Sequence, residues 1–386
     1  MTAAVEVEVS LPAVRAFRMA RQRLITPSPA GSLLEAVTAV HGIQAQVDAH
    51  AVFALGQRVA GCGPDEIRQA LWQDRTLVKT WAMRGTLHWL PRDEEPLYVS
   101  ALSDLRSARL FHWMARDGQS RTDVERFAER TMVALDGRAM TRQEIAATVI
   151  PEVGEWVSPY LLSSWGSGMS ALCSLGLVVF GPPRGGSTTF VRRDQWLDNP
   201  PELDPVASRC ELLRRYLRAF GPATTQDFGY WLGVANRDIQ DVRECVEPEL
   251  ATVLVEGKPR RVLAHDVEAL VGAGQVKMPV RLVPAFDPLL LAHRDKSDHL
   301  DMRFHKRVYG AAAWVYPVVL VDGVARATWS YARTSSRLVV TVKPFGRLNQ
   351  RVGKAVEREA RRLGAMVGLD GQVYRGSADE STAPRE

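Results

Sequence analysis

Residues 64–90 read PDEIRQALWQDRTLVKTWAMRGTLHWL, and this stretch predicts a helix that leads into a β-hairpin. Pro64 followed by two acidic residues favours a helix start, because proline is tolerated in the first turn and acidic side chains stabilise the positive end of the helix. Residues 77–81 and 86–90 are short runs rich in β-branched and aromatic side chains, as strands are. Arg84-Gly85 lies between the two runs, where the chain must turn.

Two amphipathic segments, residues 14–25 and 32–41, precede this stretch and predict further helices. The order of helices followed by a hairpin then occurs twice more along the chain. In the second copy, Thr141 and Glu144 form a capping-box pattern at the start of a helix that runs to Val149. The other predicted elements are helices at 158–175, 207–220 and 239–246, a short helix capped by Thr224, and strand pairs at 177–180 with 188–193 and 251–255 with 261–264.

A helix-turn-helix followed by a hairpin is the plan of the winged helix. Such modules usually place a helix in the major groove of DNA and the hairpin against the backbone or the minor groove. Winged helices also serve as packing units, so a scaffold built from repeats that contact only one another is an alternative. Three copies in one basic chain favour DNA binding over that alternative.

The character of the sequence changes after Met278, where β-branched and aromatic runs dominate. Asp322-Gly323 between two of these runs is a strong hairpin signal, and residues 349–363 predict a charged closing helix. The predicted strands of this region lie at 280–293, 303–309, 312–321, 324–331 and 338–342.

We therefore expect an α+β fold of three tandem winged-helix modules with a C-terminal antiparallel β-domain, either a small barrel or a curled sheet. The expected boundaries are 12–92, 93–200 and 201–275 for the three modules, 276–376 for the β-domain with its closing helix, and 377–386 for a disordered tail.

The charge of the chain permits an anionic partner without demanding one. Its 386 residues include 49 Lys and Arg against 44 Asp and Glu, a net charge of +5, and all but seven of the basic residues are arginine. This excess of arginine reflects either codon bias or the suitability of arginine for bidentate contacts with phosphates and bases.

Several classes of protein are excluded. Residues 1–8 lack the pattern of a signal peptide, and the longest apolar run, residues 311–321, is short and contains Pro317, so we expect a cytoplasmic protein with no membrane partner. The four cysteines lie far apart without a Cys-x-x-Cys pair, which argues against a zinc ribbon and against a disulfide scaffold. No phosphate loop and no dinucleotide-binding motif occurs, and we expect no cofactor.

A polar run after residue 292 could suggest a metal site, because it contains several histidines and aspartates. Their spacing fits neither His-Glu-x-x-His nor a zinc finger, so a solvated polar loop is the better interpretation and we expect no metal. The residues are His293, Asp295, Asp298, His299, Asp301 and His305.

The segment Gly42-Ile43-Gln44-Ala45-Gln46 departs from the amphipathic pattern. Gly42 is a plausible C′ residue that ends the preceding helix. If the chain is extended after Gly42, Gln44 and Gln46 point to the same side about 7 Å apart, while Ile43 and Ala45 point into the core. If the helix continues instead, Gln44 faces the core from a helix. A solvated pair of glutamines near a helix end is the third interpretation.

Gln-x-Gln at this place resembles the Gln-Φ-Gln motif of AlkZ-type DNA glycosylases, as do residues 81–88 (WAMRGTLH) and residues 286–294 (FDPLLLAHR). The resemblance runs from about Val14 to Leu363. It implies tandem winged helices around a channel, a C-terminal β-domain, and hydrolysis of the N-glycosidic bond of alkylated purines in double-stranded DNA, including bulky adducts or interstrand crosslinks. Gln46, where a related branch has Asp, is similar to the branch linked to self-resistance against DNA-alkylating natural products.

The chemistry of glutamine is compatible with such a reaction. N7 alkylation makes guanine cationic, so the base leaves as a neutral molecule and needs little acid assistance. Gln44 and Gln46 could position the attacking water and place a negative dipole near the developing charge, although an amide cannot act as a general base. No lysine nucleophile lies beside the pair in the sequence, which predicts a monofunctional hydrolase without strand cleavage.

Five residues are weaker candidates for DNA contacts. Arg84 and His88 lie in and after the first wing, although a structural role for His88 beside Trp89 is equally compatible with the sequence. His293, Arg294 and Lys296 follow an apolar strand, as in a hairpin that probes the minor groove, and a solvated turn is the alternative. Asp287 could simply begin that turn, and the tryptophans Trp81, Trp89 and Trp231 are expected in the core.

The rival function is that of a non-enzymatic winged-helix transcriptional regulator. A regulator would normally dimerise on a two-fold site and read its sequence with one recognition helix. Three unequal copies in one chain count against that arrangement, and we expect a monomer associated with the nucleoid.

Overall fold

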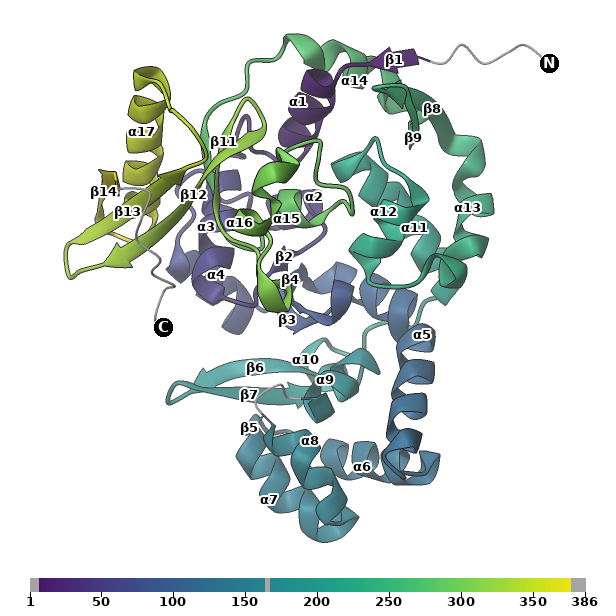
Figure 1. Cartoon of the computed structure of the whole chain (residues 1–386). Coiled ribbons are helices and arrows are strands. Elements are labelled where there is room, and N and C mark those ends of the chain that lie inside the picture. The colour runs from purple at the N-terminus through teal and green to yellow at the C-terminus, as the bar shows by residue number, and fades with distance from the viewer. Residues whose placement is uncertain (1–6, 164–166, 376–386) are drawn as a thin grey trace. The chain divides into compact units, whose positions relative to one another are not determined.

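The computed structural model describes residues 7–163 and 167–375, which form two compact units. Unit 1 contains the described residues up to Ile67, Arg214–Trp231 and the described residues from Val246 onward, and unit 2 contains Arg68–Leu213 and Leu232–Cys245. The chain passes from one unit to the other within four helices: α4 (Pro64–Trp72), α11 (Pro205–Phe220), α12 (Thr225–Leu232) and α13 (Gln240–Val246) (Figure 1). The predicted tail, residues 377–386, lies outside the described residues.

Unit 1 begins with α1 (Leu11–Arg21), α2 (Leu33–Ala39), the two-residue strand β2 (Ile43–Gln44) and α3 (Asp48–Arg58). The hydroxyl of Ser10 accepts a hydrogen bond from the backbone N–H of Ala13 and so caps α1. The helices predicted at 14–25 and 32–41 are confirmed with shifted ends, whereas α3 has no counterpart among the predicted elements.

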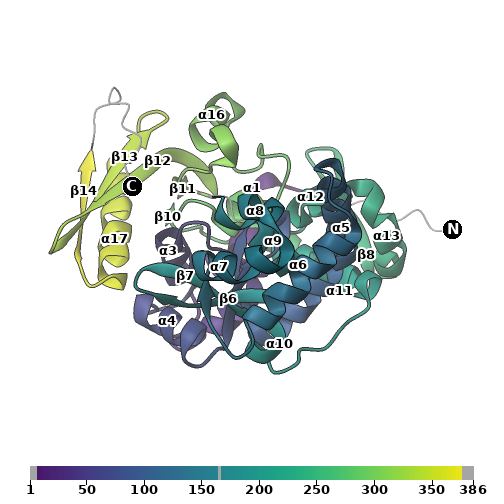
Figure 2. The same ribbon diagram turned by 90° about the horizontal axis from the view of Figure 1, so that it is seen from below.

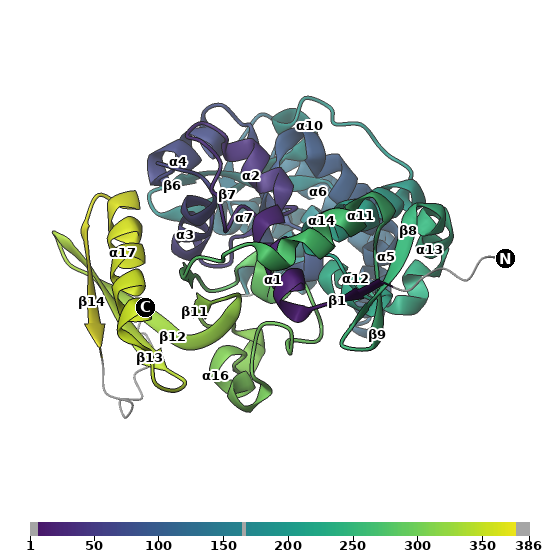
Figure 3. The same ribbon diagram turned by 90° about the horizontal axis from the view of Figure 1, so that it is seen from above.

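The third hairpin of the chain also belongs to unit 1. Strands β8 (Leu250–Val255) and β9 (Lys258–Leu263) pair antiparallel, and β1 (Val7–Val9) adds to β8 in parallel (Figure 3). Their apolar faces meet α1 and α14 (Val267–Gly272) in a core that contains Val14, Phe17, Val253, Val262 and Leu270. Burial of these side chains fixes the hairpin on the N-terminal helix.

The C-terminal sheet of unit 1 has five strands in the order β10–β11–β12–β13–β14. It is antiparallel except at its edge, where β14 runs parallel to β13 after α17 crosses over (Figure 2). The expected β-domain, closing helix and Asp322-Gly323 turn are confirmed, whereas β14 is absent from the prediction. The bounds are β10 Arg281–Val283, β11 Val318–Val321, β12 Val324–Arg333, β13 Arg337–Pro344, α17 Gln350–Met366 and β14 Asp370–Arg375.

The prediction of strands at 280–293 and 303–309 is wrong. Only β10 is extended in the first range, because Phe286 adopts a left-handed conformation (φ 58°) and Asp287 then caps the short helix α15 (Pro288–Leu291). Asp287 therefore begins a helix, and its carboxylate also forms two hydrogen bonds of 2.8 Å with the fully buried Arg58. The second range forms a 3₁₀ turn and α16 (His305–Val308).

Unit 2 contains the other two hairpins. Strands β3 (Leu77–Trp81) and β4 (Leu87–Pro91) form the first, and the second joins β6 to β7 beside a short strand β5 in the order β5–β7–β6. The remaining bounds are α5 Glu95–Arg116, α6 Arg121–Ala134, β5 Met140–Thr141, α7 Arg142–Val153, α8 Ser158–Leu162, α9 Ser167–Ser174, β6 Val178–Arg184, β7 Ser187–Arg192 and α10 Arg193–Trp196.

Some of the secondary structure predicted from local sequence patterns is confirmed in unit 2. Thr141 and Glu144 form the predicted capping box, with each side chain bonded to the backbone N–H of the other residue. The single helix predicted at 158–175 is wrong, because α8 ends at Leu162 and α9 begins at Ser167, with residues 164–166 outside the described part of the chain. Trp89 is buried as expected, and Trp81 is partly buried and packs against Phe180.

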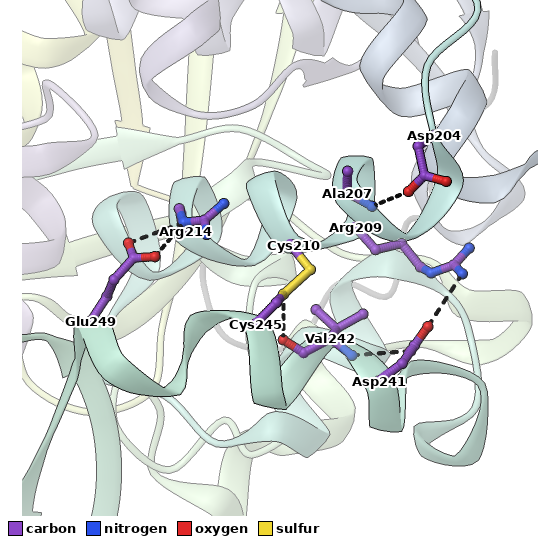
Figure 4. Close-up of a disulfide and its surroundings, with 9 residues drawn as sticks. All are labelled: Asp204, Ala207, Arg209, Cys210, Arg214, Asp241, Val242, Cys245 and Glu249. Carbon is purple, nitrogen blue, oxygen red and sulfur yellow. Dashed lines mark hydrogen bonds and ion pairs between the residues drawn. A yellow bond between two sulfur atoms is a disulfide. The ribbon is translucent and has the colours of Figure 1, made fainter.

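The cysteines correct another expectation. Cys210 of α11 and Cys245 of α13 form a disulfide within unit 2, although they are 35 residues apart in the sequence (Figure 4). Cys62 and Cys173 are buried thiols, and burial raises the pKa of the Cys62 thiol to about 12. None of the helices in the described ranges is long and apolar enough to cross a membrane.

Candidate active site and DNA contacts

The Gln-x-Gln segment begins where α2 ends in a Schellman turn. The backbone N–H of Gly42 donates to the carbonyl of Val37, and that of His41 donates to Thr38, each over 3.1 Å. His41 (φ 57°) and Gly42 (φ 94°) are both left-handed, so His41 occupies the C′ position expected for Gly42. Two successive residues with positive φ turn the chain sharply out of the helix.

After this turn Ile43 and Gln44 are extended in β2, as in the first of the three expected geometries, whereas Gln46 lies in a bend. Ile43 and Ala45 are each 1% exposed and enter the core as predicted. Gln44 is also buried, at 6% exposed, whereas Gln46 is exposed. The segment thus holds one amide in a largely desolvated position and presents a second amide to solvent.

His41 anchors the turn to the neighbouring helix α11. Burial lowers the pKa of His41 to about 3, so the imidazole is neutral at pH 7, and its Nε2 lies 2.7 Å from the carbonyl oxygen of Arg215. Because a carbonyl only accepts, Nε2 carries the proton, and Nδ1 is left as an acceptor with no partner among the described residues. The ring also packs edge-on against Phe220 and Trp231, at centroid distances of 5.9 and 6.2 Å. Sequence inspection missed this residue.

The segment after α15 is not the predicted hairpin, since residues 292–301 form an irregular loop. His293 and Lys296 are each 4% exposed. His293 Nε2 donates to the carbonyl of Phe220 over 2.9 Å, and Lys296 Nζ donates to the carbonyls of Leu290 and His293. Of the three residues predicted to contact DNA here, only Arg294 has an exposed side chain.

The same loop contributes Asp298 to a buried charge cluster that sequence inspection also missed. Arg18 Nη1 lies 2.7 Å from Asp298 Oδ2, and Arg260 Nη2 lies 2.8 Å from Asp298 Oδ1. Burial alone would raise the pKa of Asp298, but hydrogen bonds and charge from Arg260 and Arg18 outweigh it and hold the pKa well below 3.8. Asp298 is therefore a stable anion between two guanidinium groups.

A metal centre has no support in the described ranges, where no three His, Cys, Asp or Glu side chains come together as ligands. The interpretation of this run as a solvated polar loop is wrong for His293, Asp298 and His299, which are buried, whereas Asp295 is exposed. His299, for example, lies 2.9 Å from the hydroxyl of Tyr309. Buried histidines bonded in this way serve the packing of the loop.

In unit 2, Arg84 and His88 form a linked pair on the β3–β4 hairpin. His88 Nδ1 lies 2.9 Å from the carbonyl of Thr86, and Nε2 lies 3.4 Å from Arg84 Nη2. Burial, reinforced by the charge of Arg84, lowers the pKa of His88 to about 3. The neutral ring therefore donates from Nδ1 and accepts from Arg84, so His88 orients the arginine and is itself only 1% exposed.

Comparison with known proteins shows the family to which the chain belongs. The family model described as AlkZ-like DNA glycosylase matches residues 37–366. The chain belongs to the AlkZ-like DNA glycosylase family. Members are hydrolases of N-glycosyl bonds in DNA. The expected resemblance to this family is thereby confirmed, and the matched range includes the Gln-x-Gln segment and residues 81–88 and 286–294.

Two comparisons with Streptomyces sahachiroi AlkZ, one of sequence and one of structure, support the assignment. A protein named interstrand DNA cross-link repair glycosylase is 31% identical over 366 residues, which cover 92% of this chain and 96% of the relative. The solved structure of the S. sahachiroi DNA glycosylase AlkZ superimposes with a TM-score of 0.83 at 28% identity, covering 96% of this chain and all of that one. The α+β fold is therefore shared across nearly the whole chain.

Proposed function

We propose that this DNA glycosylase hydrolyses the N-glycosidic bond of N7-alkylated guanine in duplex DNA, including bulky adducts and interstrand crosslinks. The observation that carries the proposal is the Gln44–Gln46 segment, which follows a strained and anchored turn and holds Gln44 buried and Gln46 exposed. The relative named for interstrand crosslink repair supports the choice of substrate.

Gln44 and Gln46 act on the water and on the charge of the transition state. An amide oxygen accepts a hydrogen bond from the attacking water, and its dipole stabilises positive charge that develops on the sugar. Because an amide is not basic at pH 7, neither residue removes a proton in advance. Activation comes from the cationic leaving group, so unmodified bases are poor substrates.

The DNA contacts of the proposal are Arg84, oriented by His88, and Arg294. His293 and Lys296 support the Arg294 loop from within the fold, because their side-chain nitrogens are bonded to main-chain carbonyls. The division into winged-helix modules at 12–92, 93–200 and 201–275, and a monomeric state, remain part of the proposal. We propose no cofactor.

The test is alanine substitution of each glutamine. We expect Gln44→Ala and Gln46→Ala each to lower single-turnover release of N7-methylguanine by roughly 10²–10³, with duplex affinity nearly unchanged, because water positioning is realised in the transition state. The double variant should lose less than the product of the two single losses, since both amides act on one water. Release is measured on a duplex with one lesion, after alkaline cleavage of the abasic product.

Gln143→Ala is the matched control, because Gln143 is exposed on α7 and should leave the rate unchanged. Gln46 is also exposed, so its replacement should leave the circular dichroism spectrum of the native fold intact. A folded double variant that releases the base at the wild-type rate would refute the catalytic assignment. Binding without any base release by the wild type would favour the regulator.

A further inference from the structure

Unit 1 contains an open pocket of about 380 Å³ that the glutamine chemistry does not use. Three segments far apart in the sequence form it: the start of α12, the β8–β9 hairpin, and the loop after α15. Hydrogen bonds between Ala223 and Arg261 fasten the first two segments together. The Asp, Lys and Arg residues of its lining are Asp227, Lys258, Arg260, Arg294, Asp295 and Asp298.

The carboxylates of this pocket already accept hydrogen bonds from other groups of the protein. Asp298 is held by Arg18 and Arg260. Asp227 accepts from the backbone and hydroxyl of Thr224 through one oxygen and from the backbone N–H of Arg294 through the other. Asp295 accepts from the next turn of its own loop, at Ser297.

Two cationic side chains at the pocket, unlike its carboxylates, form no polar interaction with other described residues. Lys258, in the turn of the hairpin, and Arg294, in the loop, are exposed. In the described part of the chain neither side chain has an ion pair or hydrogen bond. Both are available to a ligand. Arg260 adds a third positive charge to the pocket, where its side chain is half-buried. Burial acts to lower the pKa of Arg260, but the hydrogen bonds and charge of Asp298 outweigh burial and raise this pKa.

The sum of these charges favours an anion. The lining holds three cations and three carboxylates, and Arg18, which pairs with Asp298 from outside the lining, adds a fourth positive charge. His293, the histidine in the lining, is uncharged because burial lowers its pKa well below 6.5. Lysine and arginine are the side chains that bind phosphate, lysine as a point charge and arginine through its planar fork. A single phosphate group can be approached by Lys258 from the hairpin and by Arg294 from the loop.

We propose that this pocket binds one backbone phosphate of the DNA substrate, with Lys258 and Arg294 as its direct contacts. The proposal rests on the duplex substrate of the proposed function. A hairpin that follows a helix-turn-helix commonly lies against the DNA backbone, and Lys258 occupies the turn of such a hairpin. Because a phosphate contact carries no sequence information, the site positions the duplex without reading it.

The experiment is a salt titration of binding to an undamaged duplex, which is independent of base release. Loss of one phosphate contact should lower the slope of log K against log salt concentration by about 0.9. We therefore expect the double variant Lys258→Ala/Arg294→Ala to show a slope about 0.9 shallower than the wild type, and Lys258→Arg/Arg294→Lys to retain the wild-type slope.

The matched control is Arg351→Ala/Lys354→Ala, which removes the same two charges from the exposed face of α17 and should leave the slope unchanged. An unchanged slope in the Lys258/Arg294 variant, or an equal loss in the control, overturns the phosphate site. Inorganic phosphate provides a further test. If it raises the melting temperature of the wild type but not of the Lys258/Arg294 variant, and the slope for DNA binding is the same in both, the pocket binds free phosphate. That result would also overturn the proposal of a DNA phosphate site. If the slope falls as expected but the wild type releases no N7-methylguanine, the phosphate site stands and the proposed function fails.

Discussion

His41 stands at the position where a Schellman ending favours glycine, and its φ of 57° lies in the left-handed region. For a residue with a Cβ this conformation costs about 1–2 kcal/mol. The hydrogen bond from Nε2 to Arg215 and the burial of the ring against Phe220 and Trp231 offset that cost. The strain lies three residues before Gln44, so His41 is a positioning residue for the segment that carries the glutamines.

The corresponding prediction concerns His41→Ala. Alanine keeps the unfavourable conformation and loses both the hydrogen bond and the ring packing, so the turn should relax and displace the glutamines. A displacement of about 1 Å can lower a rate by roughly 10²-fold. We expect single-turnover release of N7-methylguanine to fall by roughly 10–100-fold, while the affinity for the duplex stays within about 2-fold.

His41→Gly separates strain from anchoring, because glycine adopts positive φ freely but still lacks the ring. Its rate should fall like that of His41→Ala, while its stability should exceed that of the alanine variant. Equal binding and equal rates in wild type and folded His41→Ala would leave His41 without a role in positioning.

At the scale of elements, the β3–β4 turn of unit 2 depends on one distant glycine. A Cβ at Gly233 would lie 2.5 Å from the Cα and 2.7 Å from the backbone nitrogen of Arg84. Contacts this short require the backbone to move. The turn that presents Arg84 and the bond from Arg84 to His88 therefore rely on Gly233 as well as on the hairpin itself.

We therefore predict that Gly233→Ala lowers both stability and DNA affinity. Gly31→Ala is the control, since Gly31 has almost the same φ (82° against 84°) but no atom lies within 4 Å of the place that a Cβ would take there. Urea denaturation should show a loss of about 1 kcal/mol for Gly31→Ala, from backbone strain alone, and a larger loss for Gly233→Ala. Fluorescence anisotropy should show weaker duplex binding only for Gly233→Ala, and identical losses in the two variants would contradict the close approach.

At the scale of the molecule, five histidines whose pKa is lowered link stability to pH. Burial is the main cause in each case, and it lowers the pKa to about 3 for His41, His88 and His299, to about 4 for His50 and well below 6.5 for His293. In the unfolded chain these groups titrate near 6.5. The native state therefore binds fewer protons below pH 6.5, and the stability they contribute is present above that pH and lost as the pH falls.

The expected result is a melting temperature that is nearly constant from pH 8 to 7 and falls steadily below about pH 6.5. Each buried histidine contributes up to about 1.4 kcal/mol per pH unit in this range. Asp298, whose pKa is held below 3.8, weakens the fold only at lower pH, so its effect is separate. His112→Gln, at an exposed histidine, should leave the profile unchanged. A constant melting temperature down to pH 5 would contradict the buried neutral state.

The disulfide between Cys210 and Cys245 restricts the unfolded chain over a separation of 35 residues. In the loop-entropy description a crosslink of this span stabilises the fold by about 3–4 kcal/mol. Cys245→Ser should therefore lower the free energy of unfolding by that amount under oxidising conditions. Under a reducing agent the wild type and the variant should unfold alike, and a wild type that is indifferent to the reducing agent would show that the crosslink contributes nothing.

Much of the fold could be predicted from the sequence because its signals are local. The capping box of Thr141 and Glu144, the hairpin turn at Asp322-Gly323 and the end of α2 before Gln44 each show hydrogen bonds or turns formed within a few residues. Steric limits on φ and ψ and hydrogen bonds between near neighbours act in the same way in any tertiary context. The candidate glutamines were accessible to sequence analysis for the same reason.

Other features were decided by the tertiary structure alone. The Cys210–Cys245 disulfide, the parallel pairing of β14 with β13, and the cluster of Arg18, Arg260 and Asp298 join residues that are distant in the sequence. The apolar run at 280–293 predicts a strand, but Asp287 is drawn into a buried pair with Arg58 and begins a helix. Which polar groups are buried, and which partners they meet there, depends on how the whole chain packs, because desolvation and long-range pairing are properties of the folded interior and not of any short segment.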